Sequence, residues 1–295
     1  MNVFLRLGLL SLLIVHVSFA DGRENISIAS YNLDNYRIQD ASKRRFRSKE
    51  SRAEVARSIL NMRPQIVGLQ ELGSRAALEE LRSELSLRGL RYDHLAFLDA
   101  IDQEIHCGLL SQHPVVDDRS DAGVEFVLYG RVFRVLRGVL DVKIQPSPTE
   151  SIRVLNVHLK SKLSTWFADQ ADYRLAEAVA LRDRIDRILS TTPNAKLAVL
   201  GDFNDNPGSL AVRTVIGRGR QRLFDLRPVE QVADGGRGVS WTHYYEKIDA
   251  YFRYDFLLVS QSLKECFQPQ SAVVSGFRNW SAASDHRLIK ASFAF

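Results

Sequence analysis

The sequence predicts one α/β domain in which helices cover the faces of β-sheets. Short apolar runs with strand patterning alternate with amphipathic helical stretches in both halves of the 295-residue chain. A hydrophobic content of 45% and a charged content of 25% are those of an ordinary globular protein. We see neither an internal repeat nor a linker, and we therefore expect a single domain over residues 21–295.

The first twenty residues have the pattern of a secretory signal peptide. Arg6 precedes an apolar run at 7–17, and Ala20 ends the segment with a small residue. We expect cleavage after Ala20 and export to the periplasm or the medium. The alternative is an uncleaved anchor, but the apolar run is short for crossing a bilayer, and no later stretch is long enough.

The expected elements follow from apolar patterning. The stretch at 197–201 is uncharged and reads as a buried strand, and the helix at 53–62 places Val55, Ile59 and Met62 on one face. A second helix carries Leu78, Leu81 and Leu85 on one stripe, and the longest spans 169–189. We expect strands at 26–31, 65–69, 105–111, 123–129, 131–136, 139–144, 152–157, 197–201, 254–259 and 288–293. We expect loops at 218–222 and 234–238.

Polar side chains follow four of these apolar runs and precede the last one. A buried strand that ends in carboxylates or amides aims them rigidly at one rim of a sheet. Taken one at a time, such residues are as well explained as turn formers, helix-start charges or structural histidines. Together they indicate a functional site. The residues are Asn32, Asp34, Glu71, His158, Asp202, Asn204, Asp285 and His286.

The motifs around these residues resemble the ordered set of the endonuclease/exonuclease/phosphatase superfamily. They are S-Y-N-L-D, L-Q-E-L, N-V-H-L, G-D-F-N-D-N-P, Y-D-F-L-L-V-S and S-D-H-R, and they span about 26–293. The superfamily includes pancreatic-type deoxyribonucleases, apurinic endonucleases, neutral sphingomyelinases and inositol-polyphosphate phosphatases, and the H-L-K-S-K motif looks most like exported bacterial members. The resemblance implies a four-layer α/β/β/α sandwich of two packed mixed sheets flanked by helices. It also implies hydrolysis of a phosphate ester.

The resemblance further implies a bound Mg²⁺ or Mn²⁺. By motif match, Glu71 is the main metal ligand, joined by Asp285 and by Asn32 or Asp34 from the first strand. Carboxylate and amide oxygens are the ligands that such hard cations prefer. Zinc is disfavoured, because there is no His-Glu-x-x-His motif and the two cysteines are far apart in the sequence.

The catalytic roles come from the same motif match. Asp202 would orient or deprotonate the attacking water, with Asn204 beside it. His286 would contact the scissile phosphate and be held in its tautomer by Asp255, and His158 would face the same phosphate. Asp249 competes with Asp255 for the role of holding the histidine. We prefer Asp255 because an apolar strand follows it directly.

A basic segment at 36–52 bears on the substrate. It holds seven Lys or Arg residues against two acidic ones, a net of +5, while the whole chain has a net charge of +5. This concentration predicts a clamp for a polyanion and favours a secreted nuclease; a solvated loop or a basic helix start is the plainer explanation. The expected substrate contacts are Arg44, Arg45, Arg47, Lys49 and, in the H-L-K-S-K motif, Lys160.

Two other functions stay open at this point. A phospholipid or an inositol phosphate could be the substrate on the same fold, since fold does not determine function. A non-catalytic binding protein is the third alternative. The sequence implies no protein partner. Cys107 lies in an apolar run and is expected to be a buried thiol, although a pair with Cys266 is left open.

Overall fold

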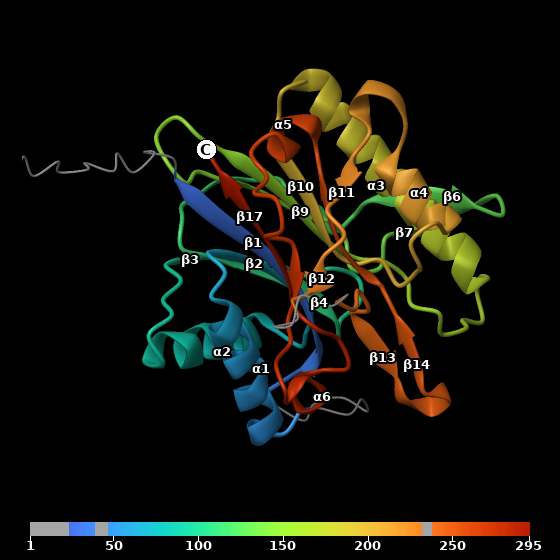
Figure 1. The fold of residues 1–295 in the computed structure, drawn as a ribbon. Coiled ribbons are helices and arrows are strands. Elements are labelled where there is room, and N and C mark those ends of the chain that lie inside the picture. The colour runs from blue at the N-terminus through green and yellow to red at the C-terminus, as the bar shows by residue number, and fades with distance from the viewer. Residues whose placement is uncertain (1–23, 39–46, 232–237) are drawn as a thin grey trace, which may run out of the picture.

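The computed structural model describes residues 24–38, 47–231 and 238–295. Two mixed β-sheets pack face to face, with helices on both outer sides (Figure 1). The predicted four-layer α/β/β/α sandwich is thus confirmed. The expected signal peptide at 1–20 and the expected loop residues 234–237 lie outside the described residues.

The first sheet contains seven strands. Their bounds are β1 (Asn25–Tyr36), β2 (Ile66–Leu72), β3 (His94–Leu98), β4 (His106–Ser111), β12 (Val229–Glu230), β16 (Val273–Val274) and β17 (Ile289–Ala294). Their order across the sheet is β12-β16-β17-β1-β2-β4-β3. The central strand β1 pairs in parallel with β2 and antiparallel with β17. Residues from the start of the chain therefore lie beside residues from its end.

The second sheet contains six strands. Their bounds are β5 (Val115–Asp118), β8 (Leu140–Ile144), β9 (Ile152–His158), β10 (Leu197–Asp202), β11 (Phe224–Asp225) and β15 (Asp255–Val259). Their order is β11-β15-β10-β9-β8-β5. Two separate hairpins are formed by β6 (Glu125–Leu128) with β7 (Arg131–Arg134) and by β13 (His243–Tyr245) with β14 (Ala250–Phe252).

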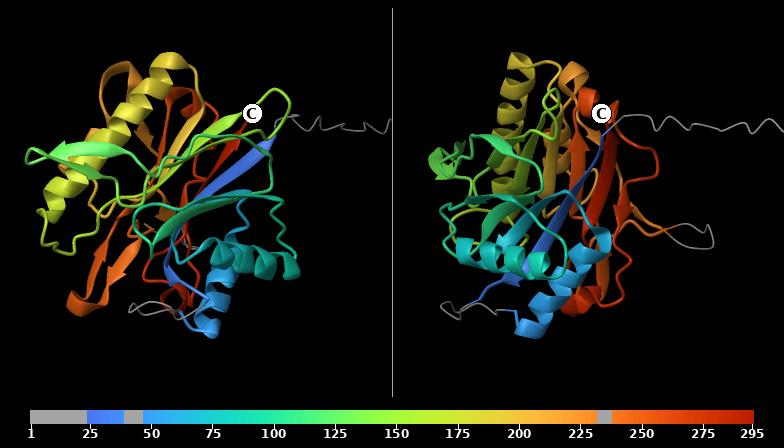
Figure 2. Two further views of the ribbon diagram at one scale, coloured as in Figure 1. Left: turned by 180° about the vertical axis from the view of Figure 1, so that it is seen from behind. Right: turned by 90° about the vertical axis from the view of Figure 1, so that its left-hand side faces the viewer.

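The helices divide between the two outer faces. Their bounds are α1 (Lys49–Met62), α2 (Arg75–Leu87), α3 (Gln170–Thr191), α4 (Leu210–Ile216), α5 (Gln261–Lys264) and α6 (Trp280–Ala283), with 3₁₀ turns η1 (Gly219–Gln221) and η2 (Glu246–Ile248). Figures 1 and 2 show α1 and α2 on one side of the molecule and α3 with α4 on the other. No helix in the described part of the chain is long and apolar enough to cross a membrane.

Three apolar clusters hold these layers together. Alternate residues of β1, such as Ile28, face the second sheet and meet Leu200 and Leu257 between the sheets. The opposite face of the first sheet packs on α1 and α2. The outer face of the second sheet packs on α3 and α4 through residues such as Leu181. Cys107 is a fully buried free thiol in the central cluster, as expected.

Several elements extend beyond the sequence-based expectation. β1 continues through Tyr36 and β2 through Leu72, with register shifts near both ends. α1 begins at Lys49 because Ser48 caps it, its Oγ accepting a hydrogen bond from the Ser51 N–H at 3.2 Å. The short strands β3 and β5, helix α4 and the β13–β14 hairpin were not predicted, because each is too short to show a clear period.

Candidate active site

Asp202, the last residue of β10, lies at the rim of the six-stranded sheet. β10 is buried over its whole length and places Asp202 opposite His158 on β9 and Asp255 on β15. Gly201 has a φ of 134°, and a Cβ there would lie 1.9 Å from the Val157 carbonyl oxygen. Only glycine therefore fits before the aspartate, which explains this residue of the G-D-F-N motif.

The Asp202 carboxylate is buried among polar groups from both sheets. Its Oδ2 atom accepts a hydrogen bond from Asn32 Nδ2 at 3.0 Å, and its Oδ1 atom accepts one from the Asn204 backbone N–H at 2.7 Å. The Nε2 atoms of His158 and His286 lie 3.5 Å and 3.7 Å from Oδ2. Burial raises the pKa of Asp202 to about 7, although the charge of His286 opposes this. A carboxylate with a pKa near neutrality is suited to accept a proton from water.

A second buried carboxylate, Asp255, holds His286. The Nδ1 atom of His286 lies 2.8 Å from Asp255 Oδ2, which leaves Nε2 on the side of Asp202. Burial alone lowers the pKa of His286, but the charges of Asp255 and Asp202 outweigh it and raise the pKa to about 10. Asp249 lies at the exposed end of the β13–β14 hairpin and accepts a hydrogen bond from Tyr244 Oη at 3.0 Å. Of the two candidates, Asp255 is the one that contacts the histidine.

Glu71 lies near the end of β2, where the pairing with β4 shifts register. Its φ of 61° is uncommon for a residue with a side chain, and such strained positions cluster at functional sites. Glu71 Oε2 accepts a hydrogen bond from the Asn35 N–H at 3.0 Å, and Oε1 accepts one from Asn32 Nδ2 at 3.2 Å. Oε1 also lies 3.9 Å from His158 Nε2. Glu71 thus joins the rim of the first sheet to the cluster around Asp202.

His243 also lies in this site, although the sequence analysis did not single it out. Its Nε2 atom is 3.6 Å from Asp285 Oδ2, and its ring centroid is 4.5 Å from that of His286. Burial favours a raised pKa for Asp285, but the hydrogen bond with His243 and the charge of His286 lower it overall. The stretch W-T-H-Y-Y ahead of Tyr254 is rich in aromatic residues, which favour strands. The strand that it forms has just three residues.

The first-strand candidates for metal ligation occupy different positions. Asn32 is fully buried, and its Nδ2 atom faces both Glu71 and Asp202, while its Oδ1 accepts a hydrogen bond from the Asp34 N–H at 3.0 Å. This geometry suits orientation of the two carboxylates. The Asp34 carboxylate forms an ion pair with Arg47. Asp34 therefore lies beside the cluster and is engaged elsewhere.

The carboxylates at the open side of the site fit a divalent cation. Glu71 and Asp285 supply oxygen atoms, and the Asp285 side chain is 44% exposed. Ligand atoms of His243, Asp285 and His286 all lie within 4.8 Å of one another. Two imidazoles therefore lie beside the Asp285 carboxylate, while Glu71 and Asp285 supply the oxygen atoms of the expected ligand set.

The described part of the basic segment is largely neutralised within the protein. Arg37 lies 3.7 Å from Glu104, Arg47 pairs with Asp34, and Arg52 donates hydrogen bonds to backbone carbonyl oxygens. Lys49 is exposed on the first turn of α1. Counting charges along the sequence thus overstated the number of cations that face solvent. Two further expected contacts, Arg44 and Arg45, lie outside the described residues.

Lys160 is buried, which does not suit the substrate contact expected of it. Its ammonium group donates to the Ser161 carbonyl at 2.9 Å and to the Leu163 carbonyl at 2.7 Å. Glu177 on α3 accepts a hydrogen bond from the Lys160 N–H at 2.6 Å, and Arg174 donates to the Lys160 carbonyl at 2.9 Å. Lys160 therefore supports the loop that follows His158, and α3 fixes that loop from outside.

Comparison with known proteins agrees with this arrangement. The sequence profile of the Endonuclease/Exonuclease/phosphatase family matches residues 27–265. No curated protein matches the chain in sequence.

Solved structures share the fold over nearly the whole chain. An endonuclease/exonuclease/phosphatase from Bacteroides vulgatus has a TM-score of 0.65 at 17% identity, covering 91% of this chain and 98% of its own. The human Nocturnin catalytic domain with bound sulfate has a TM-score of 0.61 at 17% identity, and the match covers 92% of this chain and 97% of the Nocturnin chain. Truncated TDP2 from Caenorhabditis elegans has a TM-score of 0.60 at 19% identity, and the match covers 91% of this chain and 97% of the TDP2 chain.

The profile spans most of the chain, and the strand-end residues that carry its motifs meet at one rim of the sandwich. Members of this family are hydrolases that act on phosphodiester bonds and generally depend on divalent metal ions. The chain belongs to the endonuclease/exonuclease/phosphatase family.

Proposed function

We propose that this protein is an exported nuclease that hydrolyses phosphodiester bonds of DNA or RNA with the help of Mg²⁺ or Mn²⁺. The observation that carries the proposal is the buried Asp202 carboxylate, whose pKa is raised to about 7 beside two imidazoles and two further carboxylates at the rim. Such a grouping combines a proton acceptor, a cation and metal-binding oxygens within one site. Phosphoryl transfer requires these parts, because positioning and charge neutralisation supply most of its catalysis.

Each residue then has a separate task. Asp202 accepts a proton from the attacking water, and Asn204 and Asn32 hold its two oxygen atoms in place. His286, kept protonated by Asp255, donates a hydrogen bond from Nε2 to the phosphate. His158 faces the same space from β9. Glu71 and Asp285 would hold a divalent ion, which would supply positive charge to neutralise the phosphoryl group.

A nucleic acid substrate is supported by the charge of the protein. The chain has a net charge of +5 and an isoelectric point of about 9.2, and basic proteins attract polyanions. Lys49 is exposed at the start of α1, next to the segment that holds Arg44 and Arg45 in the sequence. The Nocturnin domain on this fold was solved with bound sulfate, an anion of the same tetrahedral shape as phosphate.

A phospholipid is the second candidate because of the β13–β14 hairpin. The hairpin projects from the sheets beside the site (Figure 1) and exposes Ile248 by 66% and Tyr251 by 52%. Its turn also carries Glu246, Lys247 and Asp249, all exposed, which disfavours insertion into a membrane. Exposed aromatic side chains beside the site are equally suited to stack on bases. We therefore place the nuclease first.

A substrate panel tests the proposal. Purified protein 21–295 is assayed with DNA, RNA, sphingomyelin and inositol phosphates in Mg²⁺ or Mn²⁺, and Asp202→Asn serves as the control for contaminating activity. We expect cleavage of DNA or RNA by the wild type alone. Turnover of sphingomyelin or inositol phosphates without nuclease activity would support the second candidate. Amino-terminal sequencing of the exported protein tests the cleavage site, with Asp21 as the expected first residue.

A further inference from the structure

Four arginines form a patch on α4 and the 3₁₀ turn that follows it, away from the catalytic rim. We call Arg213, Arg218, Arg220 and Arg222 the arginine patch. All four are exposed, and none forms an ion pair with another described residue. No Asp or Glu occurs between residues 206 and 224. The patch is therefore a local excess of positive charge that the described part of the protein does not neutralise.

The backbone beneath the patch is held firmly. Arg182 of α3 is buried and donates hydrogen bonds to the Val215 carbonyl at 2.9 Å and the Gln221 carbonyl at 3.2 Å. Gly217 has a φ of 70°, and a Cβ there would lie 2.5 Å from Arg182 Nη1. Asp186, the carboxylate next to Arg182 on α3, is already paired with Arg182 at 2.5 Å. The exposed arginines thus extend from a rigid support.

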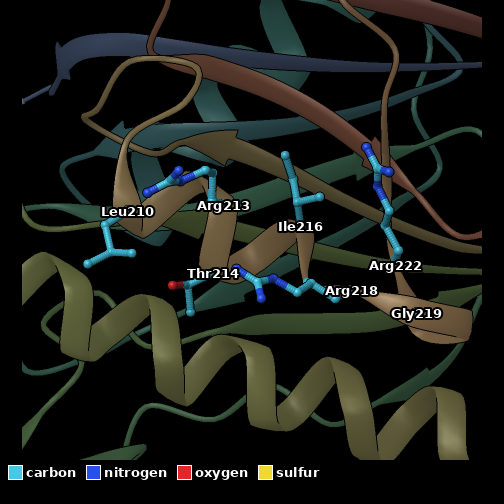
Figure 3. Close-up of a pocket in the computed structure, with 8 residues that line it drawn as sticks. Leu210, Arg213, Thr214, Ile216, Arg218, Gly219 and Arg222 are labelled. Carbon is cyan, nitrogen blue, oxygen red and sulfur yellow. The ribbon is translucent and has the colours of Figure 1, made fainter.

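The shape of the patch indicates what it binds. It borders a hollow of about 490 Å³, lined by Leu210, Thr214 and Ile216 besides three of the arginines. Figure 3 shows the guanidinium groups of Arg213, Arg218 and Arg222 spread around the helix, not converging on one point. A single phosphate ion would require convergent donors. Spread guanidinium groups suit the successive phosphates of an extended chain.

The patch and the catalytic site are separated by a distance that a long polynucleotide spans. Phe224, two residues after Arg222, pairs with Val259, which pairs with Ala198 on β10. Ala198 is four residues from Asp202, about 13 Å along β10, and β11 lies two strand spacings, about 10 Å, to the side. The patch therefore begins roughly 16 Å or more from Asp202. We propose that the arginine patch binds the backbone of a polynucleotide whose scissile phosphate occupies the site around Asp202. This inference rests on the proposed nuclease function and adds a second binding site for long substrates.

Binding of fluorescein-labelled single-stranded DNA, measured by anisotropy over a range of salt concentrations, tests the inference. The protein carries Asp202→Asn to prevent cleavage, and the probes are a 30-mer and a 6-mer of thymidine. Changing all four patch arginines to Ser should weaken 30-mer binding at least about tenfold. It should also flatten the slope of log Kd against log salt by about 2 to 3, since each phosphate contact with a single strand contributes about 0.7. Binding of the 6-mer should change less.

A matched variant controls for net charge. Arg57, Arg75, Arg88 and Arg91 are exposed on or next to α1 and α2, and changing them to Ser removes the same charge from the other side of the molecule. An equal loss in both quadruple variants would overturn the inference. The double variant Arg218→Ser, Arg220→Ser should flatten the salt slope of 30-mer binding by about half as much as the quadruple variant. It keeps the inference testable if the quadruple variant does not fold.

The two proposals fail in different ways. With an otherwise unchanged active site, the patch variant should hydrolyse bis-p-nitrophenyl phosphate at the wild-type rate, since that small diester does not reach the patch. If the wild type cleaves DNA but the patch variant binds the 30-mer as tightly as the unsubstituted protein does, the patch is not a binding site and the nuclease proposal stands. Patch-dependent binding without cleavage of any nucleic acid would reject the nuclease and the placement of a scissile phosphate at Asp202, and would leave the patch only as a polynucleotide-binding surface.

Discussion

The buried environment of Asp202 raises the pKa of its carboxyl group at a cost to the stability of the folded protein. Its carboxylate is 1% exposed and receives hydrogen bonds from Asn32 and Asn204, yet burial still raises its pKa. A folded-state pKa above the unfolded value of 3.8 means that the ionised carboxylate destabilises the folded protein. This is the trade between activity and stability that active sites commonly show.

Asp202→Asn should therefore abolish activity and stabilise the protein as pH rises. Below about pH 4 the wild-type carboxyl is protonated in both states, so the melting temperatures should be similar. Between pH 4 and about 7 the unfolded carboxyl ionises first, and the wild type should fall progressively below the variant. Calorimetry in EDTA measures this difference. A difference in melting temperature between variant and wild type that decreases with rising pH would contradict the assigned environment of Asp202.

Asp255→Asn should lower kcat by about 10²- to 10⁴-fold, because the carboxylate holds His286 and keeps it protonated. Its charge raises the pKa of His286 to about 10, so its removal should lower that pKa. Activity that needs the imidazolium is lost as pH rises through this pKa, and the alkaline limb of the pH profile should move to lower pH. Asp249→Asn is the matched control, since Asp249 is exposed and contacts Tyr244. Greater damage from Asp249→Asn would refute the assignment.

Residues at strand ends were predictable only in part. The strand before Asp202 was predictable because a strand that is buried on both faces contains no charged residues. The polar residues that follow such a strand must lie at its end. The φ of 61° at Glu71 and the proximity of His243 to Asp285 depend on tertiary contacts that leave no periodic signal. The sequence shows the charge of Lys160 but not the backbone carbonyl groups that accept hydrogen bonds from its ammonium group.

At the scale of elements, α3 supports the loop that follows His158 from the outer layer. The fully buried Glu177 accepts hydrogen bonds from the Leu136 N–H at 3.0 Å and from the Lys160 N–H at 2.6 Å. Two loops are thus tied to one helix, and the second of them follows His158 directly. Because both oxygen atoms act as acceptors, the site requires a carboxylate at this position.

Glu177→Gln should destabilise the protein, because the amide NH₂ would face a backbone N–H donor. An unsatisfied buried donor costs about 1–3 kcal/mol. In a large domain each kcal/mol lowers Tm by roughly 2–4 °C, so thermal melts should shift by several degrees. Glu79→Gln provides the control, since Glu79 is exposed and forms only an ion pair with Arg75. Equal melting temperatures of Glu177→Gln and the wild type would show that the two hydrogen bonds accepted by Glu177 contribute little to stability.

The element order was easier to predict than element ends. Long patterned segments such as α3 and β10 were found close to their true bounds. The ends of β1 and β2 were not, because bulges let both strands continue through polar residues. Short strands such as β13 depend on pairing with a neighbour, and the sequence of three residues does not specify that pairing.

At the scale of the whole molecule, the site exists only because two sheets end together. Asn32 and Glu71 come from the first sheet, and His158 and Asp202 come from the second. The Asn32 amide joins them through hydrogen bonds of 3.2 Å to Glu71 and 3.0 Å to Asp202. The proposed site therefore draws its residues from both sheets and from distant parts of the sequence.

The central claim is that these residues form a divalent-metal-dependent phosphodiesterase site. The most direct test measures hydrolysis of bis-p-nitrophenyl phosphate by protein stripped with EDTA, before and after titration with Mg²⁺ or Mn²⁺, with Glu71→Gln alongside. We predict negligible hydrolysis by the stripped wild type, restoration by either cation, and a weaker response in the variant that needs much more metal. Undiminished hydrolysis after complete metal removal, or equal metal response in Glu71→Gln, would contradict the account.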